Sequence, residues 1–284
     1  MSAIAFATLK EAVRKKTFIV MGIVTVLYLV LWAILLYYFQ NKGFGGNDQQ
    51  FKALASVMVT QMGLQFSSML MCLLTIILGA GAIASELETG MIHAIISRPL
   101  DRTEYVLGKF LGLAILTVCY ATVFYAVLFL IGGAFSLDTI TTLSFMQIFE
   151  GWVLYLLVPL SVLCLTLYGS VSLRVVPNGL LMIFIYILGN IGGMVEMIGN
   201  YINSTSIISS GIFLSLISPF HTLYAAAERV LLPSTGIAGE MMRGMGGLTG
   251  TGKPASAAMY IYIAIYSVGF IVLAIRKFRK IDIN

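Results

Sequence analysis

Charge is scarce in this sequence, and that scarcity sets the class of protein. Asp, Glu, Lys and Arg make up only 10% of the 284 residues, whereas hydrophobic residues make up 59%. A soluble domain carries roughly 25% charged residues. Because a surface that faces water cannot be built from so few charges, the composition excludes an ordinary soluble domain and indicates that lipid surrounds most of the chain.

Cysteine and histidine are rare as well. The three cysteines, Cys72, Cys119 and Cys164, lie inside apolar runs and have neither metal-ligand spacing nor an obvious disulfide role. The two histidines, His93 and His221, are predicted to lie on opposite sides of the membrane, and no His-Glu-x-x-His motif is present. We therefore expect no metal site in this chain.

Six apolar runs have the roughly 20 residues that a transmembrane helix needs. They are Thr17 to Phe39, Ala53 to Ser85, Phe110 to Gly132, Gly151 to Leu173, Val175 to Val195 and Ala255 to Ile275. The predicted fold is therefore an all-α integral membrane protein with six transmembrane helices, which form a single domain over residues 1–284.

Two shorter segments are expected to lie at the membrane surface or to enter it only partway. Apolar residues within 1–16 share one helical face, which predicts an N-terminal amphipathic interfacial helix. The apolar run from Ile207 to Phe220 is too short to cross. It predicts a re-entrant or interfacial helix before the last span, ending at Ser218-Pro219 within an external loop over 196–254.

The basic residues predict the orientation. They cluster at the ends of apolar runs, which is typical of topology determinants, so the net charge of +5 does not indicate a nucleic-acid partner. If both termini are cytoplasmic, twelve of the 17 Lys and Arg residues lie on the cytoplasmic side. The positive-inside rule therefore predicts cytoplasmic termini and a cytoplasmic loop over residues 86–109.

The loop between the second and third spans carries the most informative pattern. Glu86 and Glu88 come just past the end of a span, where we expect them in water or among headgroups, and Gly90 then permits a turn. Isoleucines at helical spacing predict a short helix that ends at Pro99, and Asp101 predicts the N-cap of the next helix. These residues suit either a lever that a soluble motor pushes or a well-capped loop without a partner.

The same loop resembles the signature of type-2 ABC exporter permeases. The shared pattern is Glu86-x-Glu88-Thr89-Gly90, then Ser97-Arg98-Pro99-Leu100-x-Arg102-x-x-Tyr105-x-x-Gly108-Lys109. The similarity is closest to the branch that includes the NosY and NatB permeases, and it covers nearly the whole chain. It implies that the loop docks onto an ATPase through Glu86, Glu88, Thr89, Gly90, Arg98, Pro99, Arg102, Tyr105, Gly108 and Lys109.

The resemblance also implies the assembly in which this chain works. Its expected partners are two cytoplasmic ABC ATPase subunits, a second permease copy and membrane lipid, in a bacterial-type plasma membrane. ATP and magnesium are then bound by the ATPase, while this chain is a non-catalytic export permease without a cofactor. Residues Gly247 to Pro254 nearly match a phosphate-binding P-loop, but Pro254 replaces the required Ser or Thr and no strand precedes the motif.

Two other functions stay open, namely a non-transporting assembly or channel-like component and a secondary carrier. Proton- and ion-coupled carriers usually place ionisable groups within the membrane. No predicted span has such a group at its centre, which weighs against a carrier. Two motifs, Gly108-x-x-x-Gly112 and Gly189-x-x-x-Gly193, permit close helix approach, either within one copy or between two copies.

Overall fold

The computed structural model describes residues 2–42, 49–90, 101–135, 137–232 and 257–280. Within these ranges the chain consists of helices joined by turns, without a strand. The helices are α1 (Ser2–Arg14), α2 (Lys16–Lys42), α3 (Gln49–Ala80), α4 (Ala84–Glu88), α6 (Arg102–Ala134), α7 (Asp138–Thr141), α8 (Phe145–Ser172), α9 (Val175–Ile202), α10 (Thr205–Ile217), α11 (Phe220–Leu231) and α13 (Ala257–Arg279). The all-α prediction is confirmed.

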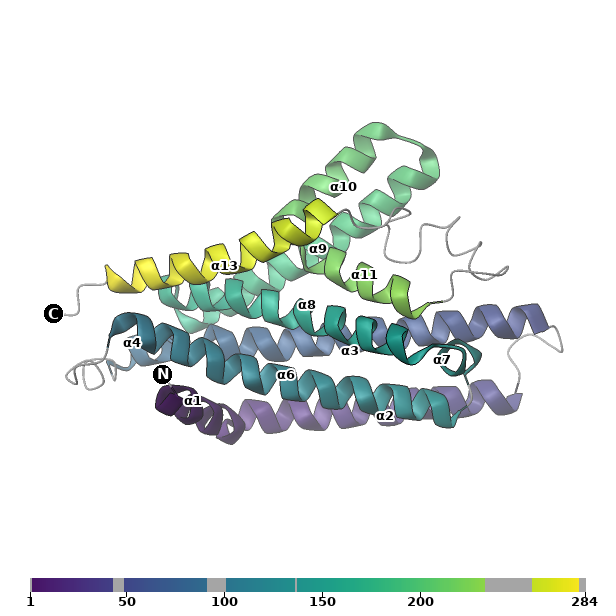
Figure 1. Cartoon of the computed structure of the whole chain (residues 1–284), viewed down its shortest axis with the longest axis horizontal. Coiled ribbons are helices and arrows are strands. Elements are labelled where there is room, and N and C mark those ends of the chain that lie inside the picture. Colours follow the sequence, from purple (N-terminus) through teal and green to yellow (C-terminus); the bar gives the residue numbers. More distant parts are fainter. Residues whose placement is uncertain (1, 43–48, 91–100, 136, 233–256, 281–284) are drawn as a thin grey trace.

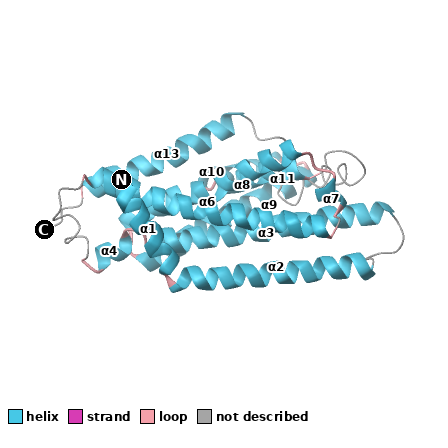
Figure 2. Cartoon of the chain, turned by 60° about the horizontal axis from the view of Figure 1, so that its bottom comes forward, coloured by secondary structure: helices cyan, strands magenta, loops and turns pink. Residues whose placement is uncertain are grey.

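The long helices lie roughly along one axis, and the two ends of the bundle differ (Figures 1 and 2). One end, which we name the terminal end, holds α1, α4 and both ends of the chain. The opposite end, the α7 end, holds the short helix between α6 and α8. Elements far apart in the sequence therefore meet at the terminal end.

Six described stretches are long and apolar enough to cross a membrane. They are Lys16–Tyr38, Ala55–Glu88, Arg102–Ala134, Phe145–Ser172, Val175–Ile202 and Ala257–Arg279. This result confirms the six predicted spans. The second stretch contains both α3 and α4, so the acidic residues placed beyond its end by the sequence belong to its last turns.

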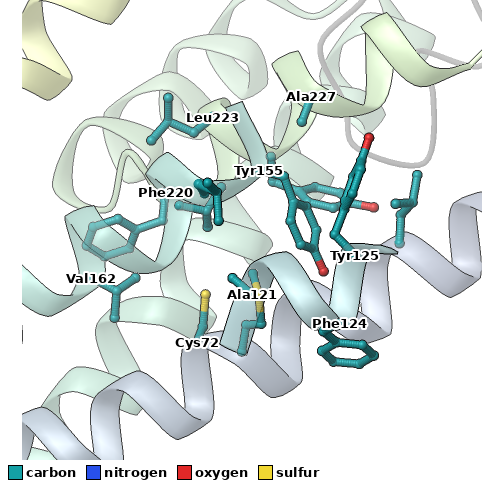
Figure 3. Packing of buried hydrophobic residues seen from close by; sticks show 14 of the residues in the cluster. Cys72, Ala121, Phe124, Tyr125, Tyr155, Val162, Phe220, Leu223 and Ala227 are labelled. Carbon is teal, nitrogen blue, oxygen red and sulfur yellow. The ribbon is translucent and has the colours of Figure 1, made fainter. Parts of the chain in front are cut away.

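The middle of the bundle is formed by α3 and α8, around which the other spans pack. Within an apolar 18-residue part of the α3–α4 stretch, 72% of the residues are buried. The corresponding fractions for parts of the same length in α2 and α13 are 22% and 11%. Figure 3 shows Phe220 and Leu223 of α11 beside Val162 and Tyr155 of α8 in the same core. The hydroxyl groups of Tyr155 and Ser67 are 2.5 Å apart, which joins α8 to α3 through a buried hydrogen bond.

The short helix expected before the last span is present, and a second helix follows it. The axes of α10 and α11 differ by 104°. The bend falls at Ser218-Pro219, where proline lacks the N–H that would continue the helix. Only α10 was anticipated from the sequence. The part of 196–254 that the structure describes is therefore mostly helical up to Leu231.

The second helix, α11, also corrects an assumption about ionisable groups. It packs against α8, and the side chains of His221 and Glu228 lie in the interior, only 7% and 3% exposed. The absence of ionisable residues from the six span centres therefore does not mean that none is buried in the bundle. The reason is that α11 is amphipathic, and a scan for long apolar runs does not detect such a helix.

Candidate functional site

The loop that resembles the ATPase-docking signature begins at the terminal end, where α4 is held by α8. The hydroxyl oxygen of Ser170 accepts hydrogen bonds from the backbone N–H groups of Ile83 and Ala84, both at 2.9 Å. These bonds satisfy donors at the start of α4 that the helix itself cannot pair. After α4, Gly90 has a φ of 70°, so the predicted turn at this glycine is confirmed.

The far side of the loop is fixed by the predicted helix cap. The side chain of Asp101 accepts a hydrogen bond from the backbone N–H of Thr103 at 3.1 Å, which confirms Asp101 as the N-cap of α6. This hydrogen bond holds the pKa of the Asp101 carboxyl below its usual value, so the cap stays ionised. The short helix predicted before Pro99 lies outside the described residues, as does Arg98.

A buried ionic cluster joins α4 to α6. The Nζ atom of Lys109 lies 2.5 Å from Oε1 of Glu86, and the hydroxyl group of Tyr105 donates a hydrogen bond to Oε2 of the same carboxylate. The residues Glu86, Lys109 and Tyr105 are 8%, 5% and 4% exposed. The expectation that Glu86 lies in water or among headgroups is therefore wrong. Both of its carboxylate oxygens are paired inside the protein.

The N-terminal helix belongs to the same cluster. Oε2 of Glu11 in α1 lies 3.4 Å from Nζ of Lys109, and its Oε1 lies 3.0 Å from Nζ of Lys15. Partial burial alone would raise the pKa of Glu11. The hydrogen bond from Lys15 and the positive charges of Lys109 and Lys15 outweigh that effect and lower it. Glu11 therefore remains ionised and bridges α1 to the α4–α6 pair.

The packing of α1 against α6 depends on a glycine. A Cβ atom added at Gly112 would lie 2.5 Å from the backbone oxygen of Ala5 and 2.9 Å from Cβ of Thr8. The small-residue face of α1 therefore lies directly against α6, whereas Phe6 is 68% exposed and points away from the bundle core. At Gly112, the Gly-x-x-x-Gly motif serves packing within one copy.

The last turn of α13 completes the cluster. The ring of Phe278 stacks on the ring of Tyr105, with centroids 5.3 Å apart and planes 17° from parallel. One guanidinium N–H of Arg102 donates to the backbone oxygen of Arg279 at 2.8 Å, and the Arg279 guanidinium donates to the hydroxyl of Thr103 at 2.9 Å. Four helices, α1, α4, α6 and α13, therefore converge on the ion pair.

The remaining signature residues in the described part of the loop are more accessible. Glu88 and Thr89 are exposed, and Gly90 and Arg102 are half-buried. The Glu88 carboxylate accepts a hydrogen bond from the backbone N–H of Val175 at 2.9 Å, so it caps the first turn of α9. A hollow of about 590 Å³ lies beside Glu88 and is lined by Ala84, Leu87, Glu88, Val171, Ser172, Leu173 and Arg174.

The signature thus divides into two sets of residues. The buried set, Glu86, Tyr105, Gly108 and Lys109, holds the loop to the bundle. The accessible set, Glu88, Thr89, Gly90 and Arg102, lies where another molecule can reach it. The roles of Glu11, Ser170 and Phe278 were not found from the sequence, because each acts on a residue far along the chain. The only sequence signal for Glu11 was its position in an amphipathic helix.

Six long apolar helices with a buried ionic cluster at one end define a multi-pass membrane protein. The family described as ABC-2 family transporter protein matches residues 2–283, which is nearly the whole chain. The chain therefore belongs to the ABC-2 transporter family, whose members are membrane permease components of ABC transporters. Membership confirms the resemblance at the level of the family and implies association with an ABC ATPase. A comparison with curated proteins finds no match.

Proposed function

We propose that this chain is the permease subunit of an ABC exporter. It moves its substrate out across a bacterial-type plasma membrane, with energy from ATP hydrolysis in a separate cytoplasmic subunit. The family match over residues 2–283 supports this proposal, and so does the placement of the signature loop on a buried, four-helix cluster. ATP and magnesium are bound by the ATPase partner, and a second permease copy completes the pathway.

The division of the signature into two sets suggests how force enters the permease. The ATPase contacts the accessible residues near Glu88 and Thr89, together with Arg98 and Pro99 outside the described residues. Displacement of α4 then acts on α6 through the pair between Glu86 and Lys109. A buried ion pair suits this role because separating its members in a low-dielectric interior is costly, so the helices move together.

A secondary carrier is the competing function, and one observation favours it. His221 and Glu228 are buried within the bundle, and ion-coupled carriers commonly use buried ionisable groups. The two functions differ in their energy source. Collapse of the proton gradient at constant ATP spares transport by an ABC exporter and stops a proton-coupled carrier.

The direct test is co-purification with the ABC ATPase under mild detergent. Replacing both Glu88 and Thr89 by lysine, which reverses one charge on the accessible side and adds a second positive charge, should reduce the amount of ATPase recovered per permease. Glu150→Lys is the matched control, because Glu150 is also exposed but lies in the first turns of α8 at the α7 end. Equal ATPase recovery from both variants contradicts the proposed contact, and loss of function from Glu228→Gln with an intact ATPase complex favours the carrier.

A further inference from the structure

A groove of about 650 Å³ lies in the terminal half of the bundle, and none of its lining residues belongs to the ionic cluster. Its lining comes from α8, α9, α10 and α13 and is almost wholly apolar or aromatic, including Tyr168, Leu181, Met182, Phe213 and Phe270, with Lys277 as its one charged residue. The volume falls within the range of about 300–1,000 Å³ that is typical of small-molecule sites.

The groove has a floor, two walls and an open side. Its floor is the last third of α8, against which both α9 and α13 pack, and the space between α9 and α13 is the groove itself. Five of its apolar lining residues are well exposed, among them Leu181 at 43%, Phe213 at 65% and Leu216 at 40%. These residues belong to a helix of membrane-spanning length and to its bent neighbour, so the open side is an apolar surface that a lipid can reach within the membrane.

One end of the groove is closed at the level of the helix break. The hydroxyl groups of Tyr262 and Tyr266 donate to the backbone oxygens of Leu216 and Ile217 at 2.7 and 3.1 Å. These bonds tie α13 to the last turn of α10 and block the groove there. From Tyr262 to Lys277 the groove follows α13 for about 22 Å at 1.5 Å per residue. One leaflet contributes about 15 Å of hydrocarbon, so the groove is long enough to take the acyl chains of one leaflet and to reach its headgroup region.

The other end carries a cation. Nζ of Lys277 lies 5.8 Å from the centroid of the Tyr168 ring, in a cation–π contact. An aromatic wall continues inward from this point, with Tyr168 against Phe270 at 5.4 Å and Phe270 against Tyr266 at 4.6 Å. Lys277 therefore has the position of a snorkelling lysine, with its stem along an apolar wall and its charge at the rim.

We infer that this groove binds one anionic phospholipid from the leaflet at the terminal end, with its acyl chains between α9 and α13 and its headgroup at Lys277. The apolar lining, the cation at the rim and a length sufficient for the acyl chains of one leaflet all suit such a lipid. Lys277 at the rim favours an anionic lipid over a purely apolar occupant such as a transmembrane helix from a second copy. The site does not depend on the direction or energy source of transport.

The test is lipid retention by the full chain. The protein is reconstituted in nanodiscs with equal amounts of phosphatidylglycerol and phosphatidylethanolamine and is then extracted in mild detergent. Native mass spectrometry measures how many molecules of each lipid stay bound. We expect one retained phosphatidylglycerol per copy. Lys277→Ala should lower that retention about fivefold, which is the usual effect of one lysine at an anionic membrane surface. Lys277→Arg should preserve it. Arg276→Ala is the matched control, because Arg276 is exposed in the same turn but does not line the groove.

A second pair of variants tests the acyl-chain part of the site. Leu181→Trp fills the groove and should lower retention of both lipids, whereas Leu180→Trp, next to it but outside the lining, should not. Size-exclusion elution and the thermal unfolding midpoint identify any tryptophan variant that fails to fold. In that case the difference in phosphatidylglycerol retention between Lys277→Arg and Lys277→Ala still tests the site. Equal retention of the two lipids, or equal effects of Lys277→Ala and Arg276→Ala, overturns the headgroup assignment. A photo-crosslinker at position 181 that captures a second copy instead of lipid overturns the site.

Discussion

Glu86 and Lys109 are 23 residues apart in the chain, yet Oε1 of one lies 2.5 Å from Nζ of the other in a buried ion pair. The pair closes the loop that carries the ABC permease signature. Because Tyr105 occupies the second oxygen of Glu86 and Glu11 approaches Lys109, the charges are compensated inside the protein. The arrangement satisfies the usual requirement that a buried charge be both paired and hydrogen-bonded.

The first prediction concerns that pair. Lys109→Ala removes the partner of a buried carboxylate and should destabilise the permease by about 3–5 kcal/mol, which is the typical cost of breaking a buried pair from one side. The thermal unfolding midpoint in detergent measures this loss. Replacing both charges, as in Glu86→Gln with Lys109→Met, should recover part of the stability. Glu150→Gln removes an exposed carboxylate and serves as the control. If Lys109→Ala unfolds at the same temperature as that control, the pair does not hold the loop.

The second prediction concerns the contact between α1 and α6. Gly112→Ala places a methyl group against the backbone of Ala5 and should cost about 1–3 kcal/mol through overpacking. Gly133→Ala is the matched control, since a Cβ at Gly133 meets nothing within 4 Å in the same helix. Hydrogen exchange of α1 should rise in the first variant and stay unchanged in the second. Equal exchange in both would mean that α1 is not seated on Gly112.

The third prediction is a pH dependence. The pKa of Glu11 is lower in the folded protein than its usual value of 4.5. Its contribution to holding α1 is therefore complete above that usual value, and it is lost as the pH falls through the lowered folded-state pKa. The hydrogen-exchange protection factors of α1 should decline over this acidic range in the native protein. In Glu11→Gln the protection should already be weaker at neutral pH, and the part of the acid dependence due to Glu11 should disappear.

The fourth prediction is the topology. The distribution of basic residues predicts that residues 86–109 are cytoplasmic and that Asn47 and Gly246 are external. Cysteines at Asn47 and Gly246, in a background without the three native cysteines, should react with impermeant thiol reagents in intact cells. A cysteine at Thr89 should react only after the membrane is opened. The reverse labelling pattern would place both termini outside.

The sequence predicted the six spans and several local signals of helix start and end because these depend on local chemistry. Long apolar runs, the Asp101 cap, the turn at Gly90 and the break at Ser218-Pro219 can each be recognised from a few neighbouring residues. All four are present in the structure. Features of this kind follow from hydrogen-bonding needs within one turn of helix.

The burial of polar groups could not be predicted in the same way. Glu86 follows an apolar span and therefore looks exposed, but Lys109 and Tyr105 from the next span cover it. Likewise, His221 and Glu228 lie in an amphipathic helix whose partner, α8, is distant in the sequence. Whether such residues face water or protein depends on long-range packing, which the pattern of a single segment does not contain.

The helix α13 is attached to the rest of the bundle at two separate levels. Phe278 stacks on Tyr105 at the terminal end, and Tyr262 and Tyr266 hold the carbonyl groups beside the bend between α10 and α11. A displacement of this 23-residue helix that is transmitted along its length would link the two regions thermodynamically. Linkage of this kind is reciprocal. If a partner that docks at the terminal end changes the affinity of the bend for a ligand by some factor, that ligand changes the affinity of the terminal end for the partner by the same factor.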